Sequence, residues 1–279
     1  MIRTSTMIGR TAAWVACLAL GLGVSAQADT VIESNNVGGD AFNVNLGGGA
    51  ANRRGEAVGS TGWYYNSVGG DATIGISSAQ SFSPRSGNGS VLFQGVDGNS
   101  KADIEYFNSA AHTPPDGVFS PTSALGLLKN LTSFSYDWYR DGSSTSNNIL
   151  APSLRLQVTD GGSQSGYLVF EPYYNQSPGP VTADQWVHSD VFGNDSILWS
   201  NGSLPNTFTY QTTLSQWMDP ASLGNFYVVG VSSGIGSGWN GTFTGAVDNI
   251  TFGFNEQDTT YNFEVKAAVP QPASVVSMV

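Results

Sequence analysis

Short runs of alternating apolar and polar residues cover the chain from residue 29 onward, separated by glycine, asparagine, aspartate and proline. A period of two is typical of β-strands with one buried face, and the separating residues are those that favour turns. No window shows the spacing of a long amphipathic helix, so we expect only single helical turns within 121–131 and 212–223. The expected strands cover residues 91–96, 102–107, 131–139, 154–158, 167–171, 226–231, 245–254 and 261–265.

This pattern predicts an all-β fold, an antiparallel β-sandwich of jelly-roll type with a concanavalin-like or galactose-binding-like arrangement. The turn Asp160-Gly161-Gly162 predicts that the strands on either side form a hairpin. The wholly apolar run 226–231 predicts a central buried strand, and 261–265 an edge strand. Seven Trp, 11 Tyr and 14 Phe supply a core, which opposes the disorder that 35 glycines would otherwise suggest. With neither repeat nor linker in view, residues 29–266 are expected to form one domain.

The first 28 residues have the pattern of a secretory signal peptide. Arg3 and Arg10 precede an apolar stretch over 12–24, and Ala26-Gln27-Ala28 provides a small-x-small cleavage site. The alternative, a membrane anchor, would need about 20 apolar residues. We therefore predict cleavage after Ala28 and a protein secreted from, or held on the surface of, a bacterium. The only cysteine, Cys17, lies within this segment, so export without disulfides is expected.

The charge balance excludes two classes of partner. The chain has 10 basic and 21 acidic residues, and cleavage after Ala28 would leave eight basic residues and a net charge of −13. Nucleic acids and anionic membranes are bound through basic surface, so neither is expected as a partner.

The residues needed for catalysis do not occur in the expected combinations. His112 lies in a predicted loop and His188 on a predicted strand, and neither accompanies a nucleophile motif, so both are expected at the surface. Asp103 and Glu105 share one strand face without the E-x-D-x-x-E pattern of sandwich glycosidases, and we expect a solvated face. Two distant histidines and no available cysteine argue against a zinc site. A non-enzymatic protein is expected.

Aromatic residues near Gly/Asn-rich loops are the candidate ligand-binding residues. Exposed rings can stack on sugars while nearby polar groups bond the hydroxyls; the alternative is that the rings fill the ends of the sandwich. The candidates are Trp63, Tyr64, Tyr65, Tyr173, Tyr174 and Trp239. Arg140 and Arg155 lie within or at the end of strands. We expect Arg155 to pair with Asp137 or Glu171, the alternative being recognition of a carboxylate or sugar.

Residues 133–140, 154–156, 166–171 and 247–251 resemble exported bacterial sandwich proteins of the PEP-CTERM sorting-signal group, a resemblance that covers about 55–265. The tail 267–279, expected to be disordered, contains Val269-Pro270-Gln271-Pro272-Ala273-Ser274, which is similar to the start of that signal. Gln271 replaces the usual glutamate, and no apolar segment or arginine cluster follows. The resemblance implies an extracellular location, with the protein released or loosely held.

The closing run 247–251 also resembles the last strand of carbohydrate-binding jelly rolls. That resemblance implies a structural calcium ion held by Asp248 together with a first-strand carboxylate, for which Glu33 is the candidate. Calcium takes six to eight oxygen ligands, which two carboxylates and loop carbonyls can supply. The alternative is that Asp248-Asn249 only makes turn or backbone hydrogen bonds.

Together these observations favour a non-enzymatic extracellular sandwich protein that binds extracellular polysaccharide. A structural component of a matrix or cell surface without a small ligand is the alternative. A glycosidase or lyase of sandwich fold is favoured less than either.

Overall fold

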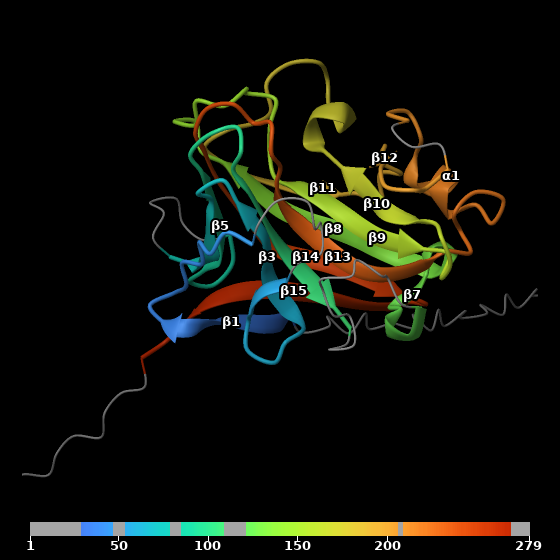
Figure 1. Ribbon diagram of the computed structural model, residues 1–279, viewed down its shortest axis with the longest axis horizontal. Coiled ribbons are helices and arrows are strands. Elements are labelled where there is room, and N and C mark those ends of the chain that lie inside the picture. The colour runs from blue at the N-terminus through green and yellow to red at the C-terminus, as the bar shows by residue number, and fades with distance from the viewer. Residues whose placement is uncertain (1–28, 47–53, 79–84, 109–120, 206–208, 269–279) are drawn as a thin grey trace, which may run out of the picture.

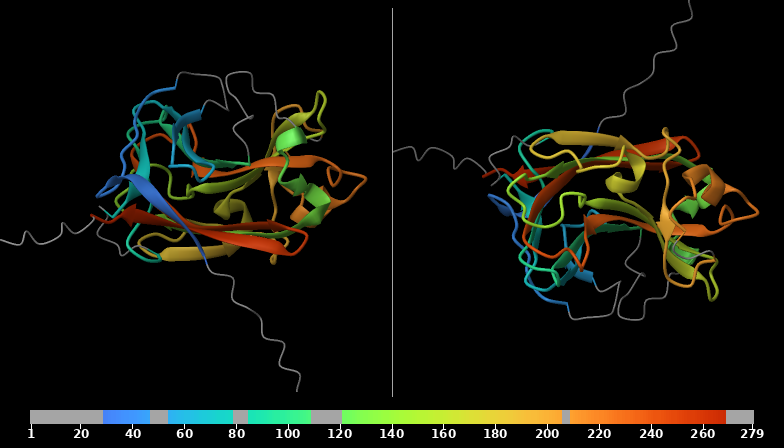
Figure 2. Two further views of the ribbon diagram at one scale, coloured as in Figure 1. Left: turned by 90° about the horizontal axis from the view of Figure 1, so that it is seen from below. Right: turned by 90° about the horizontal axis from the view of Figure 1, so that it is seen from above.

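Two β-sheets face each other in a computed structural model of the chain, which describes residues 29–46, 54–78, 85–108, 121–205 and 209–268 (Figure 1). Seen edge on, the sheets form two layers with the core between them (Figure 2). All strand pairs are antiparallel except the pair of β1 and β15. The predicted antiparallel β-sandwich is thereby confirmed.

Sheet A has seven strands and runs from β11 through β8 to β14, where it divides. One branch continues through β5 to β4, and the other through β15 to β1. Its strands are β1 (Thr30–Val37), β4 (Thr73–Ser77), β5 (Ser90–Gly95), β8 (Leu131–Arg140), β11 (Trp186–Asp190), β14 (Phe243–Phe254) and β15 (Gln257–Lys266).

The division of sheet A occurs at Asp248-Asn249 in the middle of β14. Residues 243–247 pair with β5, residues 250–254 pair with β15, and β8 lies along the other side. Asn249 has a φ of 48°, a left-handed conformation that asparagine tolerates better than most residues. The ladder is therefore interrupted at the two residues where β14 changes partner.

Sheet B has eight strands in the order β12-β10-β9-β13-β6-β3-β2, and β7 also pairs with β13. Its strands are β2 (Arg54–Ala57), β3 (Trp63–Gly69), β6 (Lys101–Phe107), β7 (Gly126–Leu127), β9 (Ser153–Thr159), β10 (Ser165–Phe170), β12 (Trp199–Ser200) and β13 (Tyr227–Ile235). The hairpin predicted at Asp160-Gly161-Gly162 joins β9 to β10. The predicted central strand is β13, which lies between β9 and β6.

One predicted strand has a different place in the sheet. The run 261–265 belongs to β15, which lies between β14 and β1 and is not an edge strand. Alternation within the run shows that one face is buried, but it does not show how many neighbours the strand has.

Helices are few and short in the described residues. The predicted helical turns are the 3-10 helices η1 (Pro121–Ser123) and η2 (Leu128–Asn130) and the α-helix α1 (Leu214–Met218), and η3 (Pro172–Asn175) adds another turn. None of them has the length and apolar character needed to cross a membrane. The predicted signal peptide, His112 and the segment 269–274 lie outside the described residues.

Candidate ligand-binding cleft

Small residues along β13 shape the outer face of sheet B. Gly230, Ser232 and Gly234 alternate on the face that points away from the core, while Val231 lies in the core. Each of the three lies opposite a larger residue on both β6 and β9. Long side chains from these two strands can therefore meet above β13.

An ion pair crosses β13 in this space. Arg155 on β9 donates from Nη1 to Asp103 Oδ1 on β6 at 2.6 Å and from Nε to Ser153 Oγ at 2.8 Å. A Cβ atom at Gly234 would lie 2.0 Å from Asp103 Oδ1, so only glycine leaves room there. Burial lowers the pKa of the Arg155 guanidinium. The negative charge of Asp103 acts in the opposite direction and keeps that pKa above its ordinary value. The prediction that Arg155 pairs with Asp137 or Glu171 was wrong. Because Ser232 and Gly234 on β13 are small, the Asp103 carboxylate on β6 can reach Arg155 across that strand.

Glu105 lies beside this pair and is fully buried. Asn66 donates to one of its oxygens, and Gln157 Nε2 lies 3.3 Å from the other. Burial, reinforced by the charge of Asp103, raises the pKa of Glu105 to about 8. The expectation that Asp103 and Glu105 form a solvated strand face was therefore wrong: Asp103 is 6% exposed and Glu105 0%.

This burial also bears on glycoside hydrolysis. That reaction needs two carboxyl groups on either side of a bound substrate. Asp103 lines the cleft described below, but Glu105 does not. Asp103 and Glu105 therefore do not face a common open groove, and the second acidic residue that lines this cleft is Glu171.

A cleft of about 360 Å3 opens over the Arg155–Asp103 pair. Trp199 and Trp239, both half-buried, line it together with polar residues, and Trp239 packs on the core residue Phe243 with ring centroids 4.9 Å apart. We call this the sheet-B cleft. Its lining residues are Ser67, Lys101, Asp103, Ser153, Arg155, Tyr167, Val169, Glu171, Trp199, Asn201, Ile235, Gly236, Ser237 and Trp239.

The charges of the sheet-B cleft nearly balance. Lys101 and Arg155 are cationic, and Asp103 and Glu171 are the acidic residues. Burial raises the pKa of Glu171, and the positive charge of Arg155 offsets only part of this rise. In a chain with a net charge of −11, this cleft is thus a place of little net charge.

Two predicted ligand-binding rings lie in the core. Trp63 and Tyr65 are both 0% exposed, because they occupy the inward-facing positions of β3. Trp63 contacts Phe263 and Tyr261 at centroid distances of 5.1 and 5.2 Å, and the Tyr65 hydroxyl donates to Asp40 Oδ2 at 2.6 Å. Neither ring is accessible to a ligand, so both are withdrawn from the candidate set. For these two rings the alternative interpretation holds: they fill the interior of the sandwich.

Other predicted aromatics lie at the surface. Tyr173 and Tyr174, on η3, are in contact at 5.3 Å, and Tyr174 is 39% exposed. Tyr210 extends the row, at 5.0 Å from Tyr174 and 5.9 Å from Trp199. The row therefore ends at a ring that lines the sheet-B cleft. Tyr64 lies on the outer face of sheet B, and its ring packs against Phe107 with ring centroids 6.0 Å apart.

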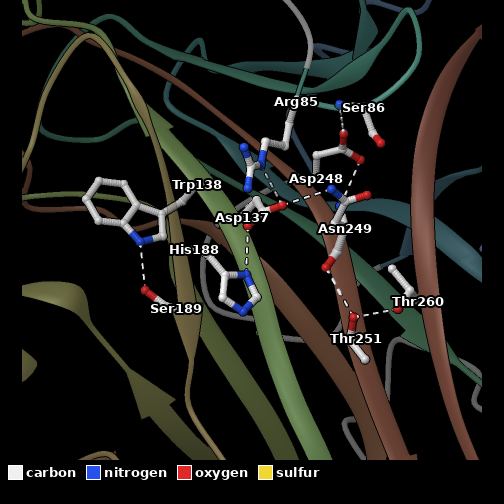
Figure 3. Close-up of polar contacts among 10 residues, drawn as sticks. All are labelled: Arg85, Ser86, Asp137, Trp138, His188, Ser189, Asp248, Asn249, Thr251 and Thr260. Carbon is white, nitrogen blue, oxygen red and sulfur yellow. Dashed lines mark hydrogen bonds and ion pairs between the residues drawn. The ribbon is translucent and has the colours of Figure 1, made fainter. Parts of the chain in front are cut away.

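Asp248, the predicted calcium ligand, is buried and holds backbone amides. Its Oδ1 accepts from the N–H groups of Asn249 at 2.8 Å and Phe263 at 3.1 Å, and its Oδ2 accepts from Ser86 at 3.2 Å. Figure 3 shows the contacts of Asp248 with Asn249 and Ser86. Burial raises the pKa of Asp248 to about 7, against these hydrogen bonds. Asp248 thus links β14 to β15 and to the segment before β5.

The predicted partner Glu33 is exposed on β1, which β15 separates from β14. Within the described residues, no three His, Cys, Asp or Glu side chains gather as a metal site would need. Calcium held by Glu33 and Asp248 therefore stays a prediction.

Asp137 organises a second polar cluster on the outer face of sheet A. It lies opposite Asp248 on one side and His188 on the other. Its Oδ2 accepts from Arg85 Nε at 3.0 Å and from Asn249 Nδ2 at 2.8 Å, and its Oδ1 lies 2.8 Å from His188 Nδ1 (Figure 3). The His188 side chain is 53% exposed, as predicted. Asp137, which was expected near Arg155, belongs to the other sheet.

Arg140 has a structural position. It is buried and donates to the carbonyl oxygens of Ser146 at 3.0 Å and Leu150 at 3.1 Å. The guanidinium therefore fixes the loop that follows β8.

Some cleft residues escaped sequence reasoning. Trp199 and Asn201 lie at β12, far in sequence from Lys101 at the start of β6, and no local motif joins the two segments. The usable signal was the run of small residues at alternate positions of β13, which marks a strand that longer neighbouring side chains can cross.

Comparisons with known proteins give structural neighbours only. No family model matches the chain, and no curated protein matches its sequence. The neighbours in these comparisons are carbohydrate-binding modules with a β-sandwich fold.

One comes from work on the promiscuous specificity of carbohydrate-binding modules of the β-sandwich superfamily, with a TM-score of 0.35 and 11% identity. That match covers 69% of this chain and 57% of the other, so the chain spans little more than half of that neighbour's length. A family 11 module from Clostridium thermocellum, in complex with a β-1,3-1,4-mixed-linked tetrasaccharide, gives 0.33 and 11% over 83% of this chain and 99% of its own. The family 11 module of a cellulosomal cellulase from that organism gives 0.30 and 10%, over 88% and 100%.

Proposed function

We propose that the protein is a non-enzymatic, extracellular β-sandwich protein that binds polysaccharide in the sheet-B cleft. The observation that carries the proposal is the pair of half-buried tryptophans, Trp199 and Trp239, beside a polar floor formed by Arg155 and Asp103. Rings of this kind can stack on the apolar faces of sugars, and the guanidinium, carboxylate and Asn201 amide can bond hydroxyl groups. The row of tyrosines that ends at Trp199 would extend the contact surface.

The near balance of charge in the cleft favours a neutral polysaccharide. Asp103 neutralises Arg155 directly, so little net charge is left to select an anionic polymer. The negative charge of the whole chain also repels polyanions.

Binding to immobilised and soluble polysaccharides tests the proposal. Trp239→Ala and Trp199→Ala are each expected to weaken binding tenfold or more, since each removes a stacking surface. Trp186→Ala is the matched control, because Trp186 is also half-buried but lies on β11 in sheet A. Equal effects of all three variants, or no binding of any polysaccharide by the unmodified chain, would contradict the proposal. The second result would favour a matrix component without a small ligand.

A further inference from the structure

A small pocket adjoins the sheet-B cleft at Glu171 and Trp239, since both residues line the cleft and the pocket. The rest of its wall consists of residues 149–151, in the loop before β9, and the first three residues of η3. We call this the η3 pocket. Its volume is about 70 Å3, whereas pockets that hold a whole small molecule have about 300–1,000 Å3. The η3 pocket can therefore hold a group of a few atoms but not a sugar ring.

The wall of the η3 pocket is mostly apolar. Ile149, Leu150 and Ala151 are aliphatic, and η3 contributes a proline and two tyrosines. Glu171 is the one carboxylate among the described lining residues, and no Lys, Arg or His is among them. Because a carboxylate oxygen only accepts hydrogen bonds, this composition suits a group that has an apolar end and an N–H or O–H donor.

Two parts of this wall are held against one buried ring. Arg140 donates to the carbonyl oxygen of Leu150 at 3.1 Å, and its guanidinium lies 5.4 Å from the centroid of the Phe243 ring. Trp239 packs on the same Phe243 ring, with ring centroids 4.9 Å apart. The loop before β9 and the Trp239 ring are thus fixed to the frame of the sandwich. The η3 pocket is therefore formed before any ligand binds, which lowers the entropic cost of filling it.

We propose that the η3 pocket receives the acetyl group of an N-acetylated sugar, so that the sheet-B cleft selects neutral polysaccharides of N-acetylated amino sugars. A sugar that stacks on Trp239 lies beside Glu171, and a substituent of its ring can reach the pocket that these two residues border. The acetyl methyl group fills the pocket, and the amide N–H donates to the Glu171 carboxylate. A methyl ether or an O-acetyl ester has an apolar end but no N–H group for the carboxylate. The inference rests on the proposed function, because the sugar must first lie in the sheet-B cleft.

Two β-1,4-linked tetrasaccharides, one of N-acetylglucosamine and one of glucose, test the inference because they differ only in the substituent at C2. Calorimetric titration of the unmodified chain should give a Kd that is lower by about tenfold or more for the N-acetylated probe, as expected for a small apolar group in a fitting pocket. Ile149→Trp puts a larger side chain at the pocket and should abolish this preference. Its affinity for the glucose probe should stay unchanged, since Ile149 does not line the sheet-B cleft.

Glu171→Ala is a second variant, which keeps the test valid if Ile149→Trp does not fold. It removes the acceptor of the amide N–H, so binding of the N-acetylated probe should weaken more than binding of the glucose probe. Glu256→Ala is the matched control, because Glu256 is exposed on the turn between β14 and β15 of sheet A. Its affinities for both probes should equal those of the unmodified chain. The Tm of each variant, measured alongside, reports whether it is folded.

The possible outcomes separate this inference from the proposed function. Equal affinity of the unmodified chain for the two probes overturns the acetyl-binding pocket and keeps the proposed function. Binding of other polysaccharides but of neither probe does the same. A preference for the N-acetylated probe that survives both Ile149→Trp and Glu171→Ala overturns the assignment to the η3 pocket. Absence of binding to any polysaccharide overturns both proposals.

Discussion

At the scale of single residues, Glu105 links stability to pH. Its pKa is about 8 in the folded protein and near the ordinary value of about 4.5 when unfolded. The folded state thus holds the proton more tightly, and stability falls as pH rises from about 4.5 to 8. The loss is a few kcal/mol at most, since one pKa unit corresponds to about 1.4 kcal/mol.

Thermal unfolding from pH 5 to pH 8.5 measures this effect. Glu105→Gln keeps a neutral hydrogen-bonding group, so its Tm should change less with pH than that of the unmodified chain. A smaller slope remains from Asp248, whose raised pKa acts in the same direction. Parallel curves for the two proteins would rule out Glu105 as the titrating group.

Two tryptophan substitutions should affect different properties, one mainly stability and the other mainly binding. Trp63→Ala removes a fully buried ring and is expected to cost about 3–5 kcal/mol of unfolding free energy. Trp239→Ala removes a half-buried ring of the sheet-B cleft, so binding should fall with a smaller loss of stability. Chemical denaturation and a binding measurement on both variants check this difference between loss of stability and loss of binding. A Trp63→Ala protein that is stably folded but does not bind would contradict it.

At the scale of elements, β13 can be tested through its glycines. Gly234→Ala would place a methyl group against Asp103 Oδ1 and against Ala102 O at 2.2 Å, and should destabilise by about 1–3 kcal/mol. Gly236→Ala is the matched control, because the nearest atom there is Trp239 Nε1 at 3.8 Å. Tm should fall by several degrees for the first variant and stay unchanged for the second. Equal Tm values would mean that the crossing of Arg155 and Asp103 does not need a glycine.

The elements were largely predictable and their arrangement was not. Alternation located the cores of β5, β6, β8, β9, β10, β14 and β15, because one buried face leaves a period of two in the sequence, and a wholly apolar run located β13. It does not encode which strand lies beside which. The partner of Arg155 was therefore misassigned, and Trp63 was placed at a loop although it faces the core. Of the candidate binding residues, Trp239 lines the sheet-B cleft, and the tyrosines of η3 lie in the row that leads to it.

At the scale of the whole molecule, a chelator tests the predicted calcium ion. An ion that binds only the folded state raises Tm, so excess chelator should lower it and added calcium should restore it. Asp248→Asn should lower Tm with or without chelator if backbone N–H groups are the main partners, since an amide nitrogen cannot accept them. If excess chelator leaves Tm unchanged, the prediction of a structural calcium ion is wrong.

The parallel ladder between β1 and β15 has a consequence for the order of events during synthesis. It pairs Ile32 with Phe263, so β1 must wait for almost the whole chain to be made before it finds its partner. A chain that ends at Asn255 would lack β15, and we expect its residues 30–37 to exchange amide hydrogens freely while β9 and β10 stay protected. Protection of β1 in that truncated chain would contradict this. The two ends of the described chain therefore close the structure together, and a nascent molecule stays open at that edge until its last strand arrives.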